Sequence, residues 1–244
     1  MITPRQEALI ASIIQEFIET AEPVSSKYLE ETGFFGLSSA TIRAEMNELE
    51  DQGYLMHLHT SGGRVPTDKA YRYLVDNLMA DQGLGLAAEL KRKVQSGLTG
   101  LGSDPRDINK RVAHLLSNIS ENLVVAGIAE QDDFYKFGLS SLFEMPEFRE
   151  FNKVFQLTSF FEEFENMFNH LERELLGEEM RIFIGKESPF ENIREETVIF
   201  ARYNLPDNCI GSLTLIGPTR MDYGKNIGLI KYTTEELNKL AKKT

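Results

Sequence analysis

Cysteine is almost absent from this 244-residue chain, and the single thiol, Cys209, excludes an internal disulfide framework. So little cysteine is typical of a protein from a reducing compartment. Long apolar runs are missing too, and none approaches the ~20 residues that a helix needs to span a bilayer. The first residues, MITPRQEALI, lack the charged-then-apolar pattern of a secretory signal. We therefore predict a cytoplasmic protein without membrane association.

Positive charge is also scarce. The chain has 26 Lys and Arg against 38 Asp and Glu, a formal net charge of −12 at pH 7. Proteins that bind nucleic acids usually carry a basic surface. The first 79 residues hold twelve carboxylates, which leaves their balance at −6, because they contain only six basic side chains: Arg5, Lys27, Arg43, Arg64, Lys69 and Arg72. Nucleic-acid binding by this region would require those cations to lie on one face.

Motifs of catalysis are missing as well. The segment GLGLAA, residues 83–88, superficially matches a dinucleotide-binding loop, but a helical pattern precedes it where that loop requires a strand. No P-loop and no G-x-S-x-G motif occurs, and Cys209 has no histidine near it in sequence. His57 and His59 have a spacing that can ligate zinc, but no third ligand is in view. We predict neither catalytic residues nor a metal or cofactor.

The N-terminal pattern predicts three helices followed by a hairpin. Thr3 can cap the first helix, and Pro4 suits its first position. Ser25 begins a short second helix, and Ser38 or Ser39 caps a third that runs to about Asp51. The segment YLMHLHTSGGRVP then has the alternation and the glycine turn of two short strands. This order predicts a winged helix-turn-helix domain over residues 1–75.

The C-terminal half has a different composition and pattern of apolar residues. Four short runs rich in β-branched and aromatic residues, LVVAGIAE, MRIFIG, TVIFARY and IGSLTLIG, predict strands. A Phe-rich run predicts a helix over residues 159–175, and a capping box predicts a last helix from Thr233. Strands and helices without regular alternation indicate the α+β class. We predict linker helices over residues 76–120, one of them begun by Asp104 and Pro105, and an α+β domain over residues 121–244.

The third predicted helix has the features of a DNA-reading helix. Ser39, Arg43 and Asn47 are spaced to share one side of it. Such a helix fits the major groove, where Arg pairs with guanine and Asn with adenine. Ser38 and Thr41 suit phosphate contacts near the helix start, where free N–H groups attract anions. The opposite side carries apolar residues that pack on the first two helices, namely Ile42, Met46 and Leu49.

Further contacts are predicted around this helix. Lys27, on the second helix, would hold the DNA backbone. In the loop TSGGR, which contains Thr60, glycines let the backbone approach phosphates, and Arg64 would enter a minor groove or contact a phosphate. His57 and His59 would face one side of the ribbon. The same pattern leaves two other interpretations open: a solvated polar face, and a module that contacts only proteins.

These segments resemble a known family. TAEPVSSKYL, SSATIRAEMNELEDQGYL and HTSGGRVPTDKAYRYLVD closely resemble HrcA, the bacterial heat-shock repressor family. GPTRMDYGKNI, the MPEF segment and RIFIGKES resemble its later parts, so that the likeness covers most of the chain. The resemblance implies a repressor that binds an inverted-repeat operator of chaperone operons as a dimer, supported by the GroEL chaperonin. It also implies a winged-helix domain, a GAF-like domain and an inserted dimerisation domain.

The chain departs from the family pattern in several places. Ala44 stands where the family usually has Asn, Gly62 where it has Ala, and Ala70 where it has Gly. The stretch between VVAGIAEQDD and MPEF is short, so we expect a GAF-like domain with a reduced or missing dimerisation insertion. A homodimer would then form through the helices of residues 69–120 or through the Phe-rich helix. Two alternatives to the chaperonin remain open as the signal that controls DNA binding: a small ligand in the GAF-like domain, and thermal lability of the fold.

Overall fold

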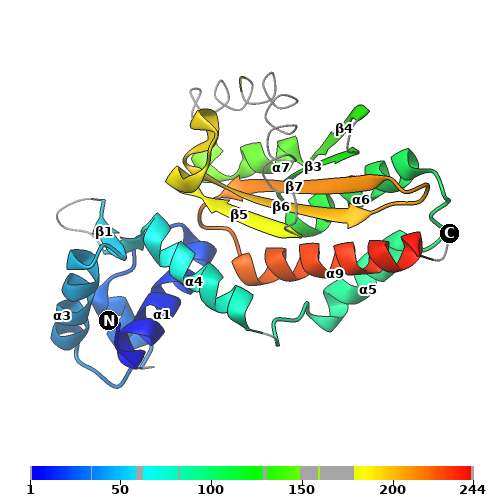
Figure 1. Ribbon diagram of the computed structural model, residues 1–244. Helices are drawn as coiled ribbons and strands as arrows, with labels where there is room; N and C mark the ends of the chain where they lie inside the picture. The colour runs from blue at the N-terminus through cyan, green and yellow to red at the C-terminus, as the bar shows by residue number, and fades with distance from the viewer. Residues whose placement is uncertain are drawn as a thin grey trace. The chain divides into compact units, whose positions relative to one another are not determined.

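The computed structural model describes residues 2–33, 35–58, 63–81, 83–128, 131–148, 159 and 179–242 (Figure 1). The chain divides into two compact units. Unit 1 comprises Met1–Gln82 with Arg220–Asp222, and unit 2 comprises Gly83–Thr219 with Tyr223–Thr244. The predicted Phe-rich helix lies outside the described residues, apart from Ser159.

Unit 1 has the predicted order of three helices and a hairpin. The helices are α1 (Pro4–Thr20), α2 (Ser26–Glu31) and α3 (Ser39–Asp51), and the ribbon pairs β1 (Leu55–His57) with β2 (Arg64–Pro66) in antiparallel register. A further helix, α4 (Asp68–Ala80), follows. The predicted caps are confirmed, because the side chains of Thr3, Ser25 and Ser38 each accept a hydrogen bond from a backbone N–H in the first turn of their helix.

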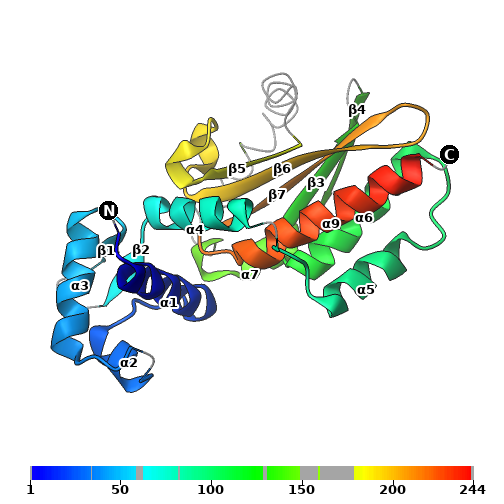
Figure 2. The same ribbon diagram turned by 60° about the horizontal axis from the view of Figure 1, so that its bottom comes forward.

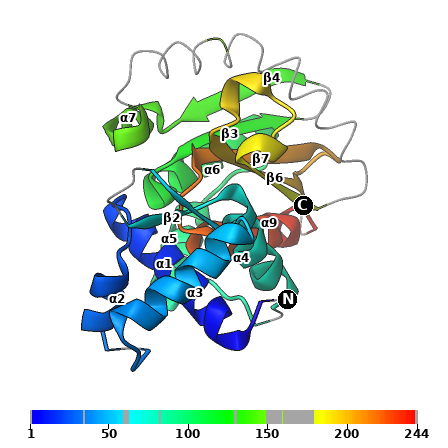
Figure 3. The same ribbon diagram turned by 90° about the vertical axis from the view of Figure 1, so that its left-hand side faces the viewer.

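The core of unit 1 lies between α1, α3 and α4. Its central side chains are at most 2% exposed: Leu9, Ile10, Ile13, Ile14, Ile42, Met46, Leu49, Tyr71 and Val75. Burial of the apolar side of α3 turns its polar side outward, as the sequence predicts. Helix α3 lies at an edge of unit 1, and the ribbon follows its C-terminal end (Figures 1 and 3).

The described residues of unit 2 form a five-stranded antiparallel sheet in the order β4-β3-β7-β6-β5. The strands are β3 (Leu123–Ile128), β4 (Gln131–Phe137), β5 (Met180–Ile184), β6 (Glu196–Asn204) and β7 (Ile210–Pro218). Four of them are the predicted strands, and β4 is an addition that the sequence pattern did not indicate. The mixed α+β class is therefore confirmed.

Helices cover one face of this sheet. They are α5 (Ala88–Leu98), α6 (Pro105–Ser120) and α9 (Tyr223–Ala241), and Figure 2 shows them along the same side. The hydroxyl of Tyr203 on β6 donates to Asn109 Oδ1 on α6, and the hydroxyls of Thr197 on β6 and Tyr223 on α9 lie 2.7 Å apart. These buried polar contacts fix α6 and α9 on the sheet.

Shorter elements cover the other face. They are α7 (Leu139–Glu144) and the 3-10 helices η1 (Pro146–Phe148), η2 (Gly185–Glu187) and η3 (Glu191–Ile193). They contribute to an apolar cluster that joins Leu123, Val125, Leu142, Phe148, Phe190, Ile193, Val198, Phe200 and Ile216. Both faces of the sheet are thus buried, which explains why its central strands are almost continuously apolar.

The last helix begins earlier than predicted. It starts at Tyr223, so the prediction of a start at Thr233 is wrong. Thr233 is fully buried inside α9, and the box-like spacing to Glu236 does not mark an N-terminus. Within the described residues, no helix combines the length and the apolar character needed to cross a bilayer.

Candidate nucleic-acid interface

The start of α3 presents hydroxyl groups. Ser38 caps the helix, and its Oγ lies 3.0 Å from Thr41 Oγ1 and accepts from the Thr41 N–H. Both side chains are exposed. Ser39 is turned the other way, because its Oγ lies 3.0 Å from the Oγ of the buried Ser26 on α2. Ser39 therefore ties α2 to α3, while Ser38 and Thr41 remain at the surface beside the free N–H groups of the helix start.

Arg43 is distinctive among the basic residues of this region. It is exposed, and it makes no hydrogen bond or ion pair with any residue that the structure describes. The other five all have partners within unit 1: Arg5 with Glu45, Lys27 with Glu31, Arg64 with Glu50, Lys69 with the Gln52 carbonyl and the Tyr54 ring, and Arg72 with Asp76. Among these six basic residues, Arg43 is thus the one without a partner in the part of unit 1 that the structure describes, and it is exposed on α3.

One turn further along α3, Asn47 belongs to a polar cluster. Arg64 Nη2 donates to Asn47 Oδ1, and Arg64 Nε lies 2.8 Å from Glu50 Oε2. The second carboxylate oxygen of Glu50 lies 2.6 Å from His57 Nδ1. We call these four residues the Arg64 cluster. It joins the C-terminal half of α3 to both strands of the ribbon.

Burial differs within the Arg64 cluster. Asn47 is exposed and Glu50 and His57 are half-buried, whereas Arg64 is only 8% exposed. Burial by itself raises the pKa of Glu50, but the hydrogen bond from His57 and the charge of Arg64 outweigh it, so the pKa lies below its ordinary value. Glu50 is therefore a carboxylate at neutral pH and compensates the buried guanidinium.

The backbone around Arg64 is held closely. Its N–H donates to the Val24 carbonyl over 2.8 Å, and the Val24 N–H donates to the Arg64 carbonyl over 2.9 Å. The neighbouring Gly63 is needed for this approach, because a Cβ there would lie 2.3 Å from the Val24 oxygen. The segment between α1 and α2 thus adds a bridge to the edge of the ribbon.

The outer side of the ribbon is apolar. Met56 is 43% exposed and Leu58 is 52% exposed, whereas His57 turns toward Glu50. His59 and Thr60, both predicted as DNA contacts, lie outside the described residues.

The structure exposes some of the predicted DNA contacts and buries others. Ser38, Thr41, Arg43 and Asn47 are exposed along α3, and Lys27 is exposed on α2. Arg64 points back to α3, and its part in DNA binding stays a prediction. Glu50 was not predicted from the sequence, although its position three residues after Asn47 places the two on neighbouring turns of one helix side.

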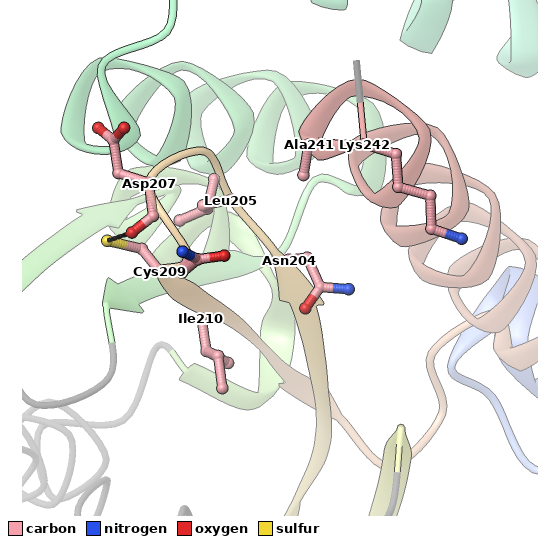
Figure 4. Close-up of a pocket in the computed structure, with 8 residues that line it drawn as sticks. Asn204, Leu205, Asp207, Cys209, Ile210, Ala241 and Lys242 are labelled. Carbon is pink, nitrogen blue, oxygen red and sulfur yellow. Dashed lines mark hydrogen bonds between the residues drawn. The ribbon is translucent and has the colours of Figure 1, made fainter. Parts of the chain in front are cut away.

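Other kinds of site have little support in the described residues. No group of three or more His, Cys, Asp and Glu side chains is arranged to hold a metal ion. A surface hollow in unit 2, lined by Asn204, Leu205, Asp207, Asn208, Cys209, Ile210, Ala241 and Lys242, contains the single thiol (Figure 4). No histidine lines this hollow, so its residues offer no imidazole base to activate Cys209.

Sequence comparisons identify related proteins. The family model described as HrcA protein C terminal domain matches residues 41–227. The heat-inducible transcription repressor HrcA of Oceanobacillus iheyensis is 27% identical over 333 residues, which cover 97% of this chain and 96% of that protein. The repressor of the same name from Desulforudis audaxviator is 26% identical over 340 residues, with coverage of 99% and 98%.

The comparisons also bear on length and fold. The alignment with the Oceanobacillus protein spans 333 positions and this chain has 244 residues, so at least 89 positions face gaps in this chain. A crystal structure described as that of a hypothetical protein at 2.2 Å resolution covers 100% of this chain and 99% of its own, with a TM-score of 0.83. At 19% identity it shows a shared fold.

Proposed function

Because this chain belongs to the HrcA family, whose relatives named above are heat-inducible transcription repressors, we propose that it represses heat-shock operons by binding operator DNA. The proposed operator is an inverted repeat, which two copies of the chain read with one twofold axis. A homodimer follows from that symmetry. The GroEL chaperonin is the partner that the family resemblance suggests.

The domain roles follow the element order. Three helices, a ribbon and an outward polar helix side support a winged helix-turn-helix domain over residues 1–75, with α3 as the reading helix. Residues 76–120 link it to a GAF-like domain over residues 121–244, with a reduced or missing dimerisation insertion. In this assignment unit 1 contacts DNA.

The observation that carries the proposal is Arg43. It is exposed at the middle of the outer side of α3 and has no partner among the described residues, so its guanidinium is available for a base edge. Arg in a major groove pairs bidentately with guanine. Ser38 and Thr41, one turn earlier, are placed for phosphates together with the helix N–H groups.

The remaining predicted contacts have supporting roles. Lys27 is exposed on α2 and would contact the backbone of DNA after leaving Glu31, a pair at 3.7 Å between exposed side chains. Asn47 lies one turn beyond Arg43 and would reach a base edge. We assign Ser39 to holding α2 against α3. His57, His59, Thr60 and Arg64 belong to the ribbon and its loop.

Fluorescence anisotropy with the full chain tests the proposal. Duplexes would first be selected from a library of randomised inverted repeats and then compared with scrambled duplexes at several salt concentrations. Arg43→Ala should weaken binding by about 1–3 kcal/mol and relax the base preference at one position of each half-site. Arg194→Ala, which removes an exposed arginine from unit 2 outside the helices of residues 69–120, is the matched control and should bind like the parent. Equal binding by Arg43→Ala and the parent would refute the assignment of α3 as the helix that reads the bases.

A second candidate is a module that contacts only proteins. The balance of −6 in the first 79 residues and the exposed Met56 and Leu58 favour it. Phosphate contacts make log affinity fall with log salt by roughly 0.9 per neutralised phosphate. A chain that shows no duplex titration at any salt concentration would favour this candidate.

A further inference from the structure

The Arg64 cluster fixes the orientation of an exposed amide. A carboxamide carries one acceptor oxygen and an NH₂ group with two donors. In this chain Asn47 Oδ1 accepts from Arg64 Nη2, and the side chain of Asn47 is exposed on α3. Since the oxygen faces a guanidinium, the Nδ2 group is directed away from it. The amide therefore cannot exchange its two ends without losing a charge-assisted hydrogen bond.

Arg64 is held through both its side chain and its backbone. Glu50 binds its Nε at 2.8 Å, the Val24 backbone pairs with its backbone, and only 8% of the residue is exposed. Asn47 and Glu50 are one helical turn apart on α3, and the guanidinium lies beside both, with Nη2 donating to the Asn47 oxygen and Nε 2.8 Å from the Glu50 carboxylate in an ion pair. The charge of Glu50 thus holds the guanidinium of Arg64 beside Asn47.

We propose that Arg64, held by Glu50, is a positioning residue that orients the Asn47 amide toward the base edge, and that neither Arg64 nor Glu50 touches DNA. The inference rests on the proposed function and adds a source of specificity to it. An outward NH₂ group selects acceptors in the major groove, such as guanine N7 and O6 or thymine O4. It discriminates against cytosine, whose edge presents a donor there.

A phosphate contact of Arg64 leads to different expectations. Lysine keeps the positive charge but cannot bind two partners in one plane. If Arg64 contacted a phosphate, Arg64→Lys would keep the base preferences of the parent, and Glu50→Gln would leave binding equal or tighter on every duplex. If Arg64 positions Asn47, both variants lose preference at the same base pair.

The experiment measures base preference across the selected operator, with each position changed to all four base pairs. Asn47→Ala should lose roughly five- to hundredfold discrimination at one position per half-site. Arg64→Lys and Glu50→Gln should lose it at that same position, and the Asn47→Ala/Arg64→Lys double variant should lose no more than Asn47→Ala alone. Asp51→Asn, an exposed charge change on the same helix, should keep the parent profile.

The possible outcomes distinguish a failure of the positioning role of Arg64 from a failure of the proposed repressor function. If Arg43→Ala relaxes preference but Arg64→Lys and Glu50→Gln keep the parent profile, the positioning role is overturned and the repressor proposal stands. A parent chain that prefers no duplex overturns the proposed function itself. Circular dichroism checks that the variants are folded, and Glu50→Gln, which keeps the size and shape of the side chain, decides the matter if Arg64→Lys does not fold.

Discussion

Replacing Gly63 by alanine should displace the ribbon from the segment between α1 and α2. The added Cβ would lie 2.3 Å from the Val24 oxygen, 2.4 Å from the Val24 carbonyl carbon and 2.8 Å from the Pro23 carbonyl carbon. All three are backbone atoms, so no side chain can rotate to make room. The backbone must move instead.

The expected loss can be worked from the contacts. Movement breaks the two hydrogen bonds between Val24 and Arg64, of 2.8 and 2.9 Å, each with a net contribution of about 1 kcal/mol. Overpacking in a close contact adds about 1–3 kcal/mol. The free energy of unfolding of unit 1 should therefore fall by roughly 3–5 kcal/mol, a large part of the ~5–15 kcal/mol that stabilises a typical domain.

Two measurements check this value. Urea unfolding followed by circular dichroism gives the free energy, since the chain has no tryptophan to report by fluorescence. Hydrogen exchange gives the protection of the Val24 and Arg64 amides, which should drop in Gly63→Ala. Gly102→Ala is the control, because its Cβ meets nothing within 4 Å. A loss below about 0.5 kcal/mol in Gly63→Ala, with protected amides, would refute the close approach.

Two other predictions concern polar side chains with partners inside the protein. The pKa of Glu50 is lowered from 4.5, so its contribution to stability is present above that pH and is lost as the pH falls through the lower pKa of the folded state. The difference in unfolding free energy between the parent and Glu50→Gln should therefore shrink between about pH 5 and pH 3. A difference that stays constant over this range would contradict the lowered pKa. Tyr203→Phe should cost about 1–3 kcal/mol because it leaves the buried Asn109 oxygen without its donor, whereas Tyr232→Phe, at an exposed contact with Gln95, should change little in the same urea titration.

Local signals explain what could be predicted from the sequence. Thr3, Ser38 and Asp104 cap helices through their own neighbours, so their roles are visible in short stretches. Strand β4 was missed because QDDFYKF lacks an apolar alternation, and its strand conformation depends on pairing with β3. At Thr233 a local capping pattern was misleading, because the apolar residues before it, including Ile227 and Ile230, pack as part of one longer helix.

The candidate site shows more clearly that contacts between residues distant in the sequence cannot be predicted from local patterns. The exposed side of α3 follows from helical spacing, so Arg43 could be placed in advance. The partners of Arg64 could not, because Asn47 and Glu50 meet it only when the ribbon folds back on α3. A glycine-arginine pair in a loop favours a cation directed at phosphate, whereas the structure adds two partners from a helix. Long-range proximity of this kind leaves no periodic pattern in the sequence.

The pairing of five of the six basic side chains in the first 79 residues has a consequence for how such a chain would search a genome. Cations paired with carboxylates of the same chain, as four of these five are, release few counterions from random DNA, so general adhesion to the duplex is weak. A genome offers on the order of a million to a billion competing sites, and each one held even loosely withdraws a molecule from its target. A repressor built this way would stay mostly unbound between encounters, and a small number of copies would suffice to keep an operator occupied.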